Sequence, residues 1–189
     1  MVTSFAKVLE TALYERMAEY ISYNSIMTDQ QFGFRKGYST DEAIFKLVHE
    51  VLNALNDKSK VGSIFLDLEK AFDSVNHSLL IKKLSYYGKA KQLIESYLSN
   101  RYQRVILKNF RTNFNVVSEW ESVKHGVPQG SVLGPLLFLL YINDLPKEVP
   151  SGTIPIQFAD DTCLLIASSN TCELQKEFTT SILQLNKWF

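Results

Sequence analysis

The sequence has few of the features that mark a disulfide-rich, highly charged or membrane-embedded protein. Its two cysteines, Cys163 and Cys172, match neither a disulfide framework nor a C-x-x-C zinc spacing, which favours a reducing, intracellular setting. Twenty basic and twenty acidic side chains cancel, so no chain-wide positive charge attracts nucleic acid. The longest apolar run, residues 132–142, is too short to span a bilayer, and the first residues show no signal-peptide pattern. We therefore expect no membrane partner.

What the sequence does contain is enough apolar material for one globular core. Of its 189 residues, 46% are hydrophobic and 12% aromatic, which argues against a disordered chain. Helical spacing recurs over residues 4–21, 43–55, 77–88, 91–100 and 173–189, and an apolar helix follows the Gly-Pro-rich turn that opens at residue 126. Strand patterns cover residues 61–68, 102–108 and 114–123 and flank residues 160–161. The strands at 102–108 and 114–123 are expected to form an antiparallel pair. Because these elements do not alternate as βαβ units, the pattern predicts an α+β fold.

Two of the expected helices carry capping signals. Ser4 can cap the first, and Ser39 and Glu42 stand at capping-box spacing before the second. The first helix is predicted to be amphipathic, with its apolar residues near helical spacing. These residues are Phe5, Val8, Leu9, Leu13, Met17, Tyr20 and Ile21.

Aspartates follow two of the strand patterns. Asp67 ends "VGSIFLD", and Asp160 and Asp161 lie between two apolar half-strands in "PIQFADDTCLL". Adjacent carboxylates repel each other unless a cation compensates them. If the two strands end together, Asp67 and Asp160 meet although 93 positions (160 minus 67) separate them. Oxygen ligands of this kind suit Mg²⁺, and two ions about 3.5–4 Å apart can stabilise both the attacking and the leaving oxygen of a displacement.

A second polar segment is "GVPQGSVLGP", residues 126–135. Gly126 and Gly130 permit tight turns and Pro128 stiffens the segment. Gln129 offers a donor and an acceptor at the start of the apolar helix, where phosphate is favoured. This segment is therefore a candidate for contact with a nucleotide.

In this order, "FLDLEKAFD", "GVPQGSVLGP" and "FADD" resemble the three central palm motifs of reverse transcriptases. The stretches "FAKVLETALYERM" and "QFGFRKGYST" resemble finger-side motifs of the non-LTR (LINE-type, jockey-like) retrotransposon branch, so the similarity covers essentially the whole chain. The resemblance implies a right-hand polymerase with an antiparallel palm sheet packed on helices. Residues from 1 to about 60 would be finger-side and those from about 61 to 189 palm. A fragment without the thumb is expected.

The resemblance also implies the metal site. Asp67 and Asp160 would bind the metal, with Asp161 as the second carboxylate of the turn, and all three would be catalytic. Leu68 would contribute a backbone group near the metal and the triphosphate. The implied cofactor is a pair of Mg²⁺ or Mn²⁺ ions.

Nucleotide contacts are implied at four further positions. Phe72 matches the steric gate that disfavours a ribose 2′-hydroxyl. Gln129 and Gly130 match the motif that touches the incoming nucleotide and the template. Arg35 would meet the template backbone or the triphosphate, and Lys70 could add positive charge.

The implied activity is RNA-directed DNA polymerisation, in which a primer 3′-hydroxyl attacks the α-phosphate of a dNTP. The implied partners are an RNA template, a DNA primer, dNTPs and the rest of a retrotransposon polyprotein, including an endonuclease and the thumb. Such a ribonucleoprotein would occupy cytoplasm and nucleus. Two other functions remain open: an inactive remnant or nucleic-acid-binding module, and an RNA-dependent RNA polymerase, which "PQG" and Phe72 disfavour.

Structural roles also remain open at these positions. The "FADD" stretch could be a polar turn, Phe72 a core residue, Gln129 a partner for nearby backbone and Arg35 an ordinary surface side chain. The histidines have no ligand spacing, and Glu69 and Asp73 are expected to be solvated or helix-capping. The histidines are His49, His77 and His125.

Overall fold

The computed structural model describes residues 4–108 and 115–188. The helices are α1 (Ser4–Tyr23), α2 (Thr40–Asn56), α3 (Ala71–Ser74), α4 (His77–Lys83), α5 (Lys89–Leu98), α6 (Leu133–Ile142) and α7 (Thr171–Trp188), with short 3₁₀ helices at Leu84–Tyr87 and Leu145–Lys147. The strands are β1 (Lys60–Leu66), β2 (Tyr102–Gln103), β3 (Ile106–Lys108), β4 (Asn115–Val117), β5 (Glu121–Ser122), β6 (Thr153–Phe158) and β7 (Asp161–Ser168). This mixture confirms the α+β expectation.

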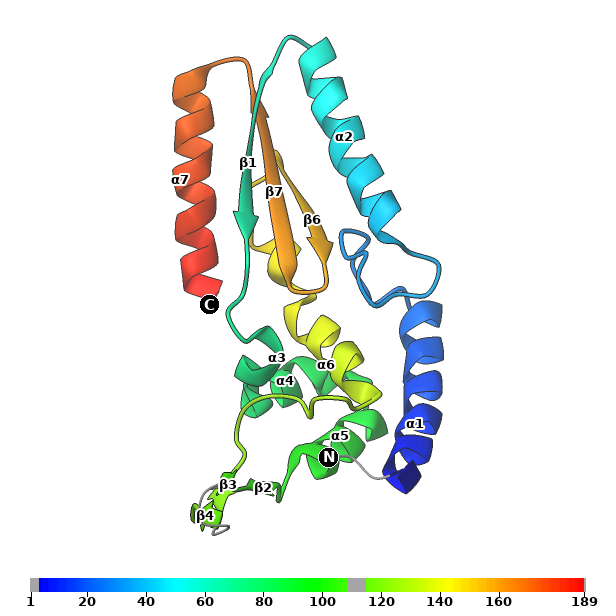
Figure 1. Ribbon diagram of the computed structural model, residues 1–189. Coiled ribbons are helices and arrows are strands. Elements are labelled where there is room, and N and C mark those ends of the chain that lie inside the picture. The colour runs from blue at the N-terminus through cyan, green and yellow to red at the C-terminus, as the bar shows by residue number, and fades with distance from the viewer. Residues whose placement is uncertain (1–3, 109–114, 189) are drawn as a thin grey trace.

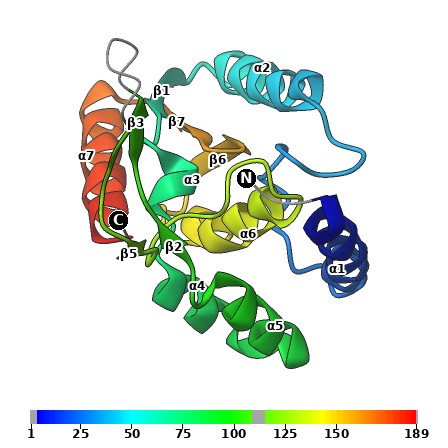
Figure 2. The same ribbon diagram turned by 60° about the horizontal axis from the view of Figure 1, so that its bottom comes forward.

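A three-stranded antiparallel sheet of order β1-β7-β6 lies between two helices (Figure 1). Helix α7 covers one face, where Gly62 of β1 lies against Phe178. Helix α2 covers part of the other face, where Ala43 packs with Ile156 and Cys163. The view in Figure 2 also has the sheet between these two helices. The face beside α2 stays partly open, since Phe65 of β1 is 72% exposed.

Helix α6 is the centre of the main hydrophobic core. Every residue in it except Pro135 and Tyr141 is buried, as expected of a helix that is apolar on all sides. It contacts α1, α3 and α4. The turn before it and the short helix α3 are therefore held on a rigid base.

The predicted pair of strands between residues 102 and 123 is present as two short antiparallel ladders, β2 with β5 and β3 with β4. Two expected positions, Phe114 at the start of a strand and Phe189 at the end of the last helix, lie outside the described residues. No helix within residues 4–108 and 115–188 is long and apolar enough to cross a membrane.

The capping prediction for α2 is confirmed, because Ser39 and Glu42 form a reciprocal capping box. The expected apolar face of α1 is partly wrong. Phe5 is 91% exposed and Val8 and Leu9 are also exposed, whereas Met17 and Ile21 are buried. Tertiary packing selects the face of a helix that faces the core, and here that face is rotated away from the first apolar residues.

Candidate functional site

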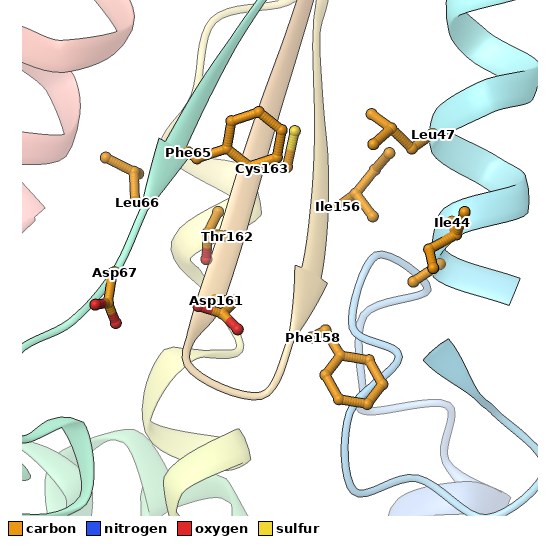
Figure 3. A pocket seen from close by; sticks show the side chains of 11 residues that line it. Ile44, Leu47, Phe65, Leu66, Asp67, Ile156, Phe158, Asp161, Thr162 and Cys163 are labelled. Carbon is orange, nitrogen blue, oxygen red and sulfur yellow. The ribbon is translucent and has the colours of Figure 1, made fainter. Parts of the chain in front are cut away.

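Antiparallel pairing brings Asp67 and Asp161 to the same end of the sheet. Leu66 of β1 is opposite Thr162 of β7. Asp67 follows Leu66 and Asp161 precedes Thr162, so in this antiparallel pair both aspartates lie at the same end. Side chains on a strand alternate between faces. Both carboxylates therefore project on the partly open face, as Figure 3 shows.

The two carboxylates line one pocket of about 430 Å³. Its other walls are side chains of α2, β1, β6 and β7, all of them apolar except Thr162. The lining residues are Ala43, Ile44, Leu47, Phe65, Leu66, Asp67, Ile156, Phe158, Asp161, Thr162 and Cys163 (Figure 3). Burial raises the pKa of the Cys163 thiol, which keeps this wall uncharged. The only charged groups in the lining are thus the two aspartates.

Asp160 lies one position before Asp161, in the two-residue turn between β6 and β7. It is half-buried and is not among the residues that line the pocket. The pocket lining thus includes Asp67 and Asp161, and Asp160 adjoins it in the turn. The assignment of Asp160 as a metal ligand stays a prediction.

Within the described residues, the carboxylates of Asp67, Asp160 and Asp161 have no hydrogen-bond or ion-pair partner. Two unpaired carboxylates on one face are a hard-oxygen donor set that suits a divalent cation, with water and substrate phosphates completing the coordination. The described part of the chain holds no cluster of three or more His, Cys, Asp or Glu arranged around a metal position. The donor set fits a site that substrate helps to complete.

The segment that begins at Gly126 is anchored to helix α3, which follows Asp67. The N–H of Gly126 donates to the carbonyl of Val75 (2.8 Å) and that of Val127 to the carbonyl of Phe72 (2.9 Å). A Cβ on Gly126 would stand 2.9 Å from the Asp73 carbonyl oxygen, so this close approach requires glycine. Two motifs that lie far apart in the sequence are therefore one structural unit.

The same unit includes Gln129. Its Nε2 donates to both carboxylate oxygens of exposed Asp73, at 3.3 and 3.4 Å. Gly130 is exposed with φ +73°. Neither residue lines the aspartate pocket, and their predicted contacts with nucleotide and template stay predictions.

Phe72 is half-buried and packs against the main core. Its ring centroid lies 4.6 Å from that of Phe138 and 6.0 Å from that of Phe34. The core role that the sequence left open is thus present, and the partial exposure leaves the gate role compatible with it. Leu68 also packs against this core, and Lys70 adopts a left-handed backbone at the start of α3.

Arg35 folds back onto its own loop. Its Nη1 donates to the carbonyls of Thr28 (2.6 Å) and Gln31 (3.0 Å), and its guanidinium stacks over Tyr38. Its described contacts are therefore structural, and the predicted contact with template or triphosphate is untested. His77, whose Nε2 lies 2.7 Å from the Gly126 carbonyl oxygen, also has a structural contact.

A family model described as reverse transcriptase (RNA-dependent DNA polymerase) matches residues 1–188. The chain belongs to the reverse transcriptase family. Among curated proteins, this reverse transcriptase chain is 34% identical to the probable RNA-directed DNA polymerase from transposon BS of Drosophila melanogaster. That match covers 100% of this chain and 21% of the relative. The chain is also 35% identical to the probable RNA-directed DNA polymerase from transposon X-element of the same species, over 89% of this chain and 18% of that relative. The chain thus spans about a fifth of the length of these relatives.

The reverse transcriptase fold is also found in a solved structure of apo telomerase from Candida tropicalis, truncated from its C-terminal domain. The TM-score is 0.59 with 15% identity, over 92% of this chain and 36% of that one. At this identity the likeness shows the fold alone. It supports the fingers-and-palm interpretation of a sheet with helices on both faces.

Two buried polar residues of this reverse transcriptase domain escaped the sequence analysis. Glu10 of α1 is 2% exposed and Gln31 is 1% exposed. Glu10 lies on the helical stripe that continues from Ile21 through Met17 and Tyr14 toward the N-terminus, and a charge on that stripe was the available signal. Gln31 opens the stretch "QFGFRKGYST", but no pattern pointed to its partner, Ala159, which is 128 positions away.

Proposed function

We propose that this domain is the catalytic part of a retrotransposon RNA-directed DNA polymerase that adds dNTPs to a primer 3′-hydroxyl. The observation that carries the proposal is the pocket at one end of an antiparallel sheet in which Asp67 and Asp161 have no partner among the described residues. The names of the Drosophila relatives support the reaction and the retrotransposon origin. RNA template, DNA primer and dNTPs are the proposed substrates.

The carboxylates of Asp67, Asp160 and Asp161 and a backbone group of Leu68 would hold two Mg²⁺ or Mn²⁺ ions. Bound divalent ions supply positive charge for the triphosphate and lower the pKa of the attacking hydroxyl. The chain's own contribution is to position reactants, because little covalent chemistry is left to the protein in phosphoryl transfer. In this proposal the unit made by α3 and the Gly126–Gly130 turn orients the nucleotide, with Phe72 against its sugar.

We further propose that residues up to about 60 serve as the finger side and that the residues from about 61 onward serve as the palm. The helix α2 and the loop before it then cover the nucleotide, while β1, β6 and β7 carry the carboxylates. Template pairing, and not protein contact, selects the incoming base.

Primer extension on an RNA template with Mg²⁺ and dNTPs tests the proposal. The proteins are the 189-residue chain and a chimera in which it replaces the matching fifth of the transposon BS polymerase. Each is compared with Asp67→Asn and Asp161→Asn. The matched control is Asp57→Asn, an exposed carboxylate just before the opposite end of β1.

Loss of either site carboxylate should lower extension by at least about 10²-fold, because the variant loses a negative charge that would hold the divalent ions against the phosphates. Asp57→Asn should change extension little, and Mn²⁺ binding measured by electron paramagnetic resonance should weaken only in the two site variants. Full activity of Asp67→Asn, or absence of extension by a folded chain and a folded chimera, would overturn the proposal. Preference for ribonucleotides over dNTPs would point to an RNA-dependent RNA polymerase.

A further inference from the structure

We propose that Gln31 is a positioning residue for the aspartate turn. Its side-chain amide forms hydrogen bonds with the backbone of Ala159 and so fixes the positions of Asp160 and Asp161 relative to Asp67. The inference rests on the proposed polymerase function, because it assigns a role within that active site.

The amide of Gln31 makes hydrogen bonds on both sides of Ala159. Its Oε1 accepts from the N–H of Ala159 at 2.9 Å, and its Nε2 donates to the carbonyl oxygen of Ala159 at 3.2 Å. The same Oε1 accepts from the N–H of Gly33 at 2.8 Å. One side chain thus binds both polar groups of a single residue in the turn and ties them to its own loop.

The turn needs such a partner. Ala159 is 7% exposed, and its φ of +56° places it in the left-handed region, which is unfavourable for an alanine. Backbone N–H and C=O groups that are removed from water require hydrogen-bond partners. Gln31 supplies both, so the strained residue that directly precedes Asp160 is held from outside the hairpin.

The loop that carries Gln31 is itself attached to the hairpin. The N–H of Phe32 donates to the carbonyl of Gln157 (2.8 Å), and the N–H of Gln157 donates to the carbonyl of Gln30 (2.7 Å). A Cβ added to Gly33 would stand 2.2 Å from the nitrogen of Ala159, so the loop and the turn are in direct contact there. Arg35 bonds the carbonyl of Gln31 from the other side.

This attachment matters because the carboxylates come from different strands. Asp67 follows β1, whereas Asp160 and Asp161 belong to the β6–β7 hairpin. A shift of the turn changes their separation from Asp67 directly. A displacement of about 1 Å at a site that orients reactants can lower the rate by about 10²-fold.

A buried glutamine could instead contribute only to stability, and the same hairpin offers a matched control. Gln157 is 0% exposed. Its Nε2 is 3.4 Å from Thr162 Oγ1, and within the described residues its Oε1 has no hydrogen-bond partner. Its side chain does not bond the turn backbone. Gln31→Met and Gln157→Met therefore remove the same amide from equally buried positions, and only the first releases Ala159.

The first measurement is amide hydrogen exchange of the 189-residue chain, resolved at Ala159 by NMR. Gln31→Met should speed exchange at Ala159 by at least about tenfold relative to wild type, since a lost hydrogen bond of about 1.4 kcal/mol corresponds to that factor. Gln157→Met should leave Ala159 within about twofold of wild type. Equal protection of Ala159 in Gln31→Met and wild type would overturn the inference.

The second measurement is primer extension, in whichever form of the protein extends a primer. Gln31→Met should lower kcat by about 10–100-fold and raise the Mg²⁺ concentration for half-maximal rate, with KM for dNTP nearly unchanged. The kcat of Gln157→Met should stay within about threefold of wild type, even if its Tm falls as far as that of Gln31→Met. If the two variants lose kcat in proportion to Tm, Gln31 is only a stabilising residue and the inference fails.

A third variant keeps the experiment decisive if Gln31→Met does not fold. In Gln31→Glu the introduced carboxyl can accept from Ala159 N–H in either form, but can donate to the Ala159 carbonyl only when protonated. Relative to wild type at each pH, its protection of Ala159 should therefore rise as pH falls. If the ratio of Ala159 protection in Gln31→Glu to that in wild type is independent of pH, the proposed hydrogen bonds between Gln31 and Ala159 are contradicted.

The outcomes separate this inference from the proposed function. If wild type does not extend a primer but Gln31→Met speeds exchange at Ala159, the polymerase function is refuted and the role of Gln31 in holding the turn is supported. Wild type that extends, with Gln31→Met indistinguishable from Gln157→Met, supports the polymerase and refutes that role.

Discussion

Glu10→Ala should destabilise the domain strongly, although Glu10 lies on a surface helix and outside the aspartate pocket. Glu10 is 2% exposed. One of its oxygens accepts from the N–H of Val132 at 2.7 Å and the other from the hydroxyl of Tyr97 at 2.8 Å. Val132 is the N-cap of α6 and has no side-chain cap of its own. Glu10 thus supplies the cap from α1, next to the positive end of the helix dipole.

The magnitude follows from the two donors that would lose their acceptor. A fully buried donor without an acceptor costs about 1–3 kcal/mol, and Val132 and Tyr97 are half-buried, so each should cost toward the lower end of that range. The cost of burying the carboxyl group, several kcal/mol for an ion, is recovered in the variant and offsets part of that loss. We expect a net loss of about 2–4 kcal/mol in the free energy of unfolding for Glu10→Ala. Tyr97→Phe removes one donor only and should cost about 1–2 kcal/mol.

Urea denaturation followed by circular dichroism measures both variants and their double mutant. Removal of groups that act on each other should give a coupling energy of about 0.5–3 kcal/mol. The control is Glu15→Ala, an exposed glutamate on the same helix, which should stay within about 0.5 kcal/mol of wild type. If Glu10→Ala is as mild as Glu15→Ala, the long-range cap does not exist in solution.

Three further predictions concern the turn, the gate and the pH dependence. In Gly33→Ala, the new Cβ, 2.2 Å from Ala159 N, must move by at least 0.8 Å (3.0 minus 2.2). Extension should then fall by about 10²-fold. The comparison is Gly37→Ala, which meets no atom within 4 Å and adds only the backbone strain of φ +84°; equal activities would refute the contact. Phe72→Val should lower stability by about 1–3 kcal/mol in urea and relax discrimination against ribonucleotides, and an unchanged sugar preference would remove the gate assignment. Burial, with Glu10 adding to it, raises the pKa of Tyr97 from 10.0 to about 12. As pH rises, the unfolded chain loses the Tyr97 proton before the folded chain does. The contribution of this group to the free energy of unfolding is therefore complete below pH 10, and wild type should lose it relative to Tyr97→Phe as pH rises toward 12. A difference in urea midpoint between the two proteins that stays constant with pH would contradict this prediction.

Local patterns predicted much of the fold because the forces that form single elements act over a few residues. The capping box at Ser39 and Glu42, the strand that ends before Asp67 and the apolar helix α6 were all visible as short-range signals. The expected apolar face of α1 was partly wrong, since Phe5, Val8 and Leu9 stay exposed while Met17 and Ile21 are buried. Which side of a helix is buried depends on the segment that packs against it, and in α1 that segment lies more than 100 residues further along the chain.

The sequence alone determined the family, the order of the motifs and the chemical type of the site, because these reside in residue identities and spacing. Tertiary structure decided that Asp67 and Asp161 line the same pocket. The antiparallel register, set by pairing of distant strands, brings both to one end of the sheet, and a slip of one residue would turn every side chain of the strand to the other face. It also brought Gln31 to Ala159 and Glu10 to Val132, across 128 and 122 positions. The partner in such a contact cannot be found from periodicity, since it depends on where the folded backbone presents a free N–H or C=O group.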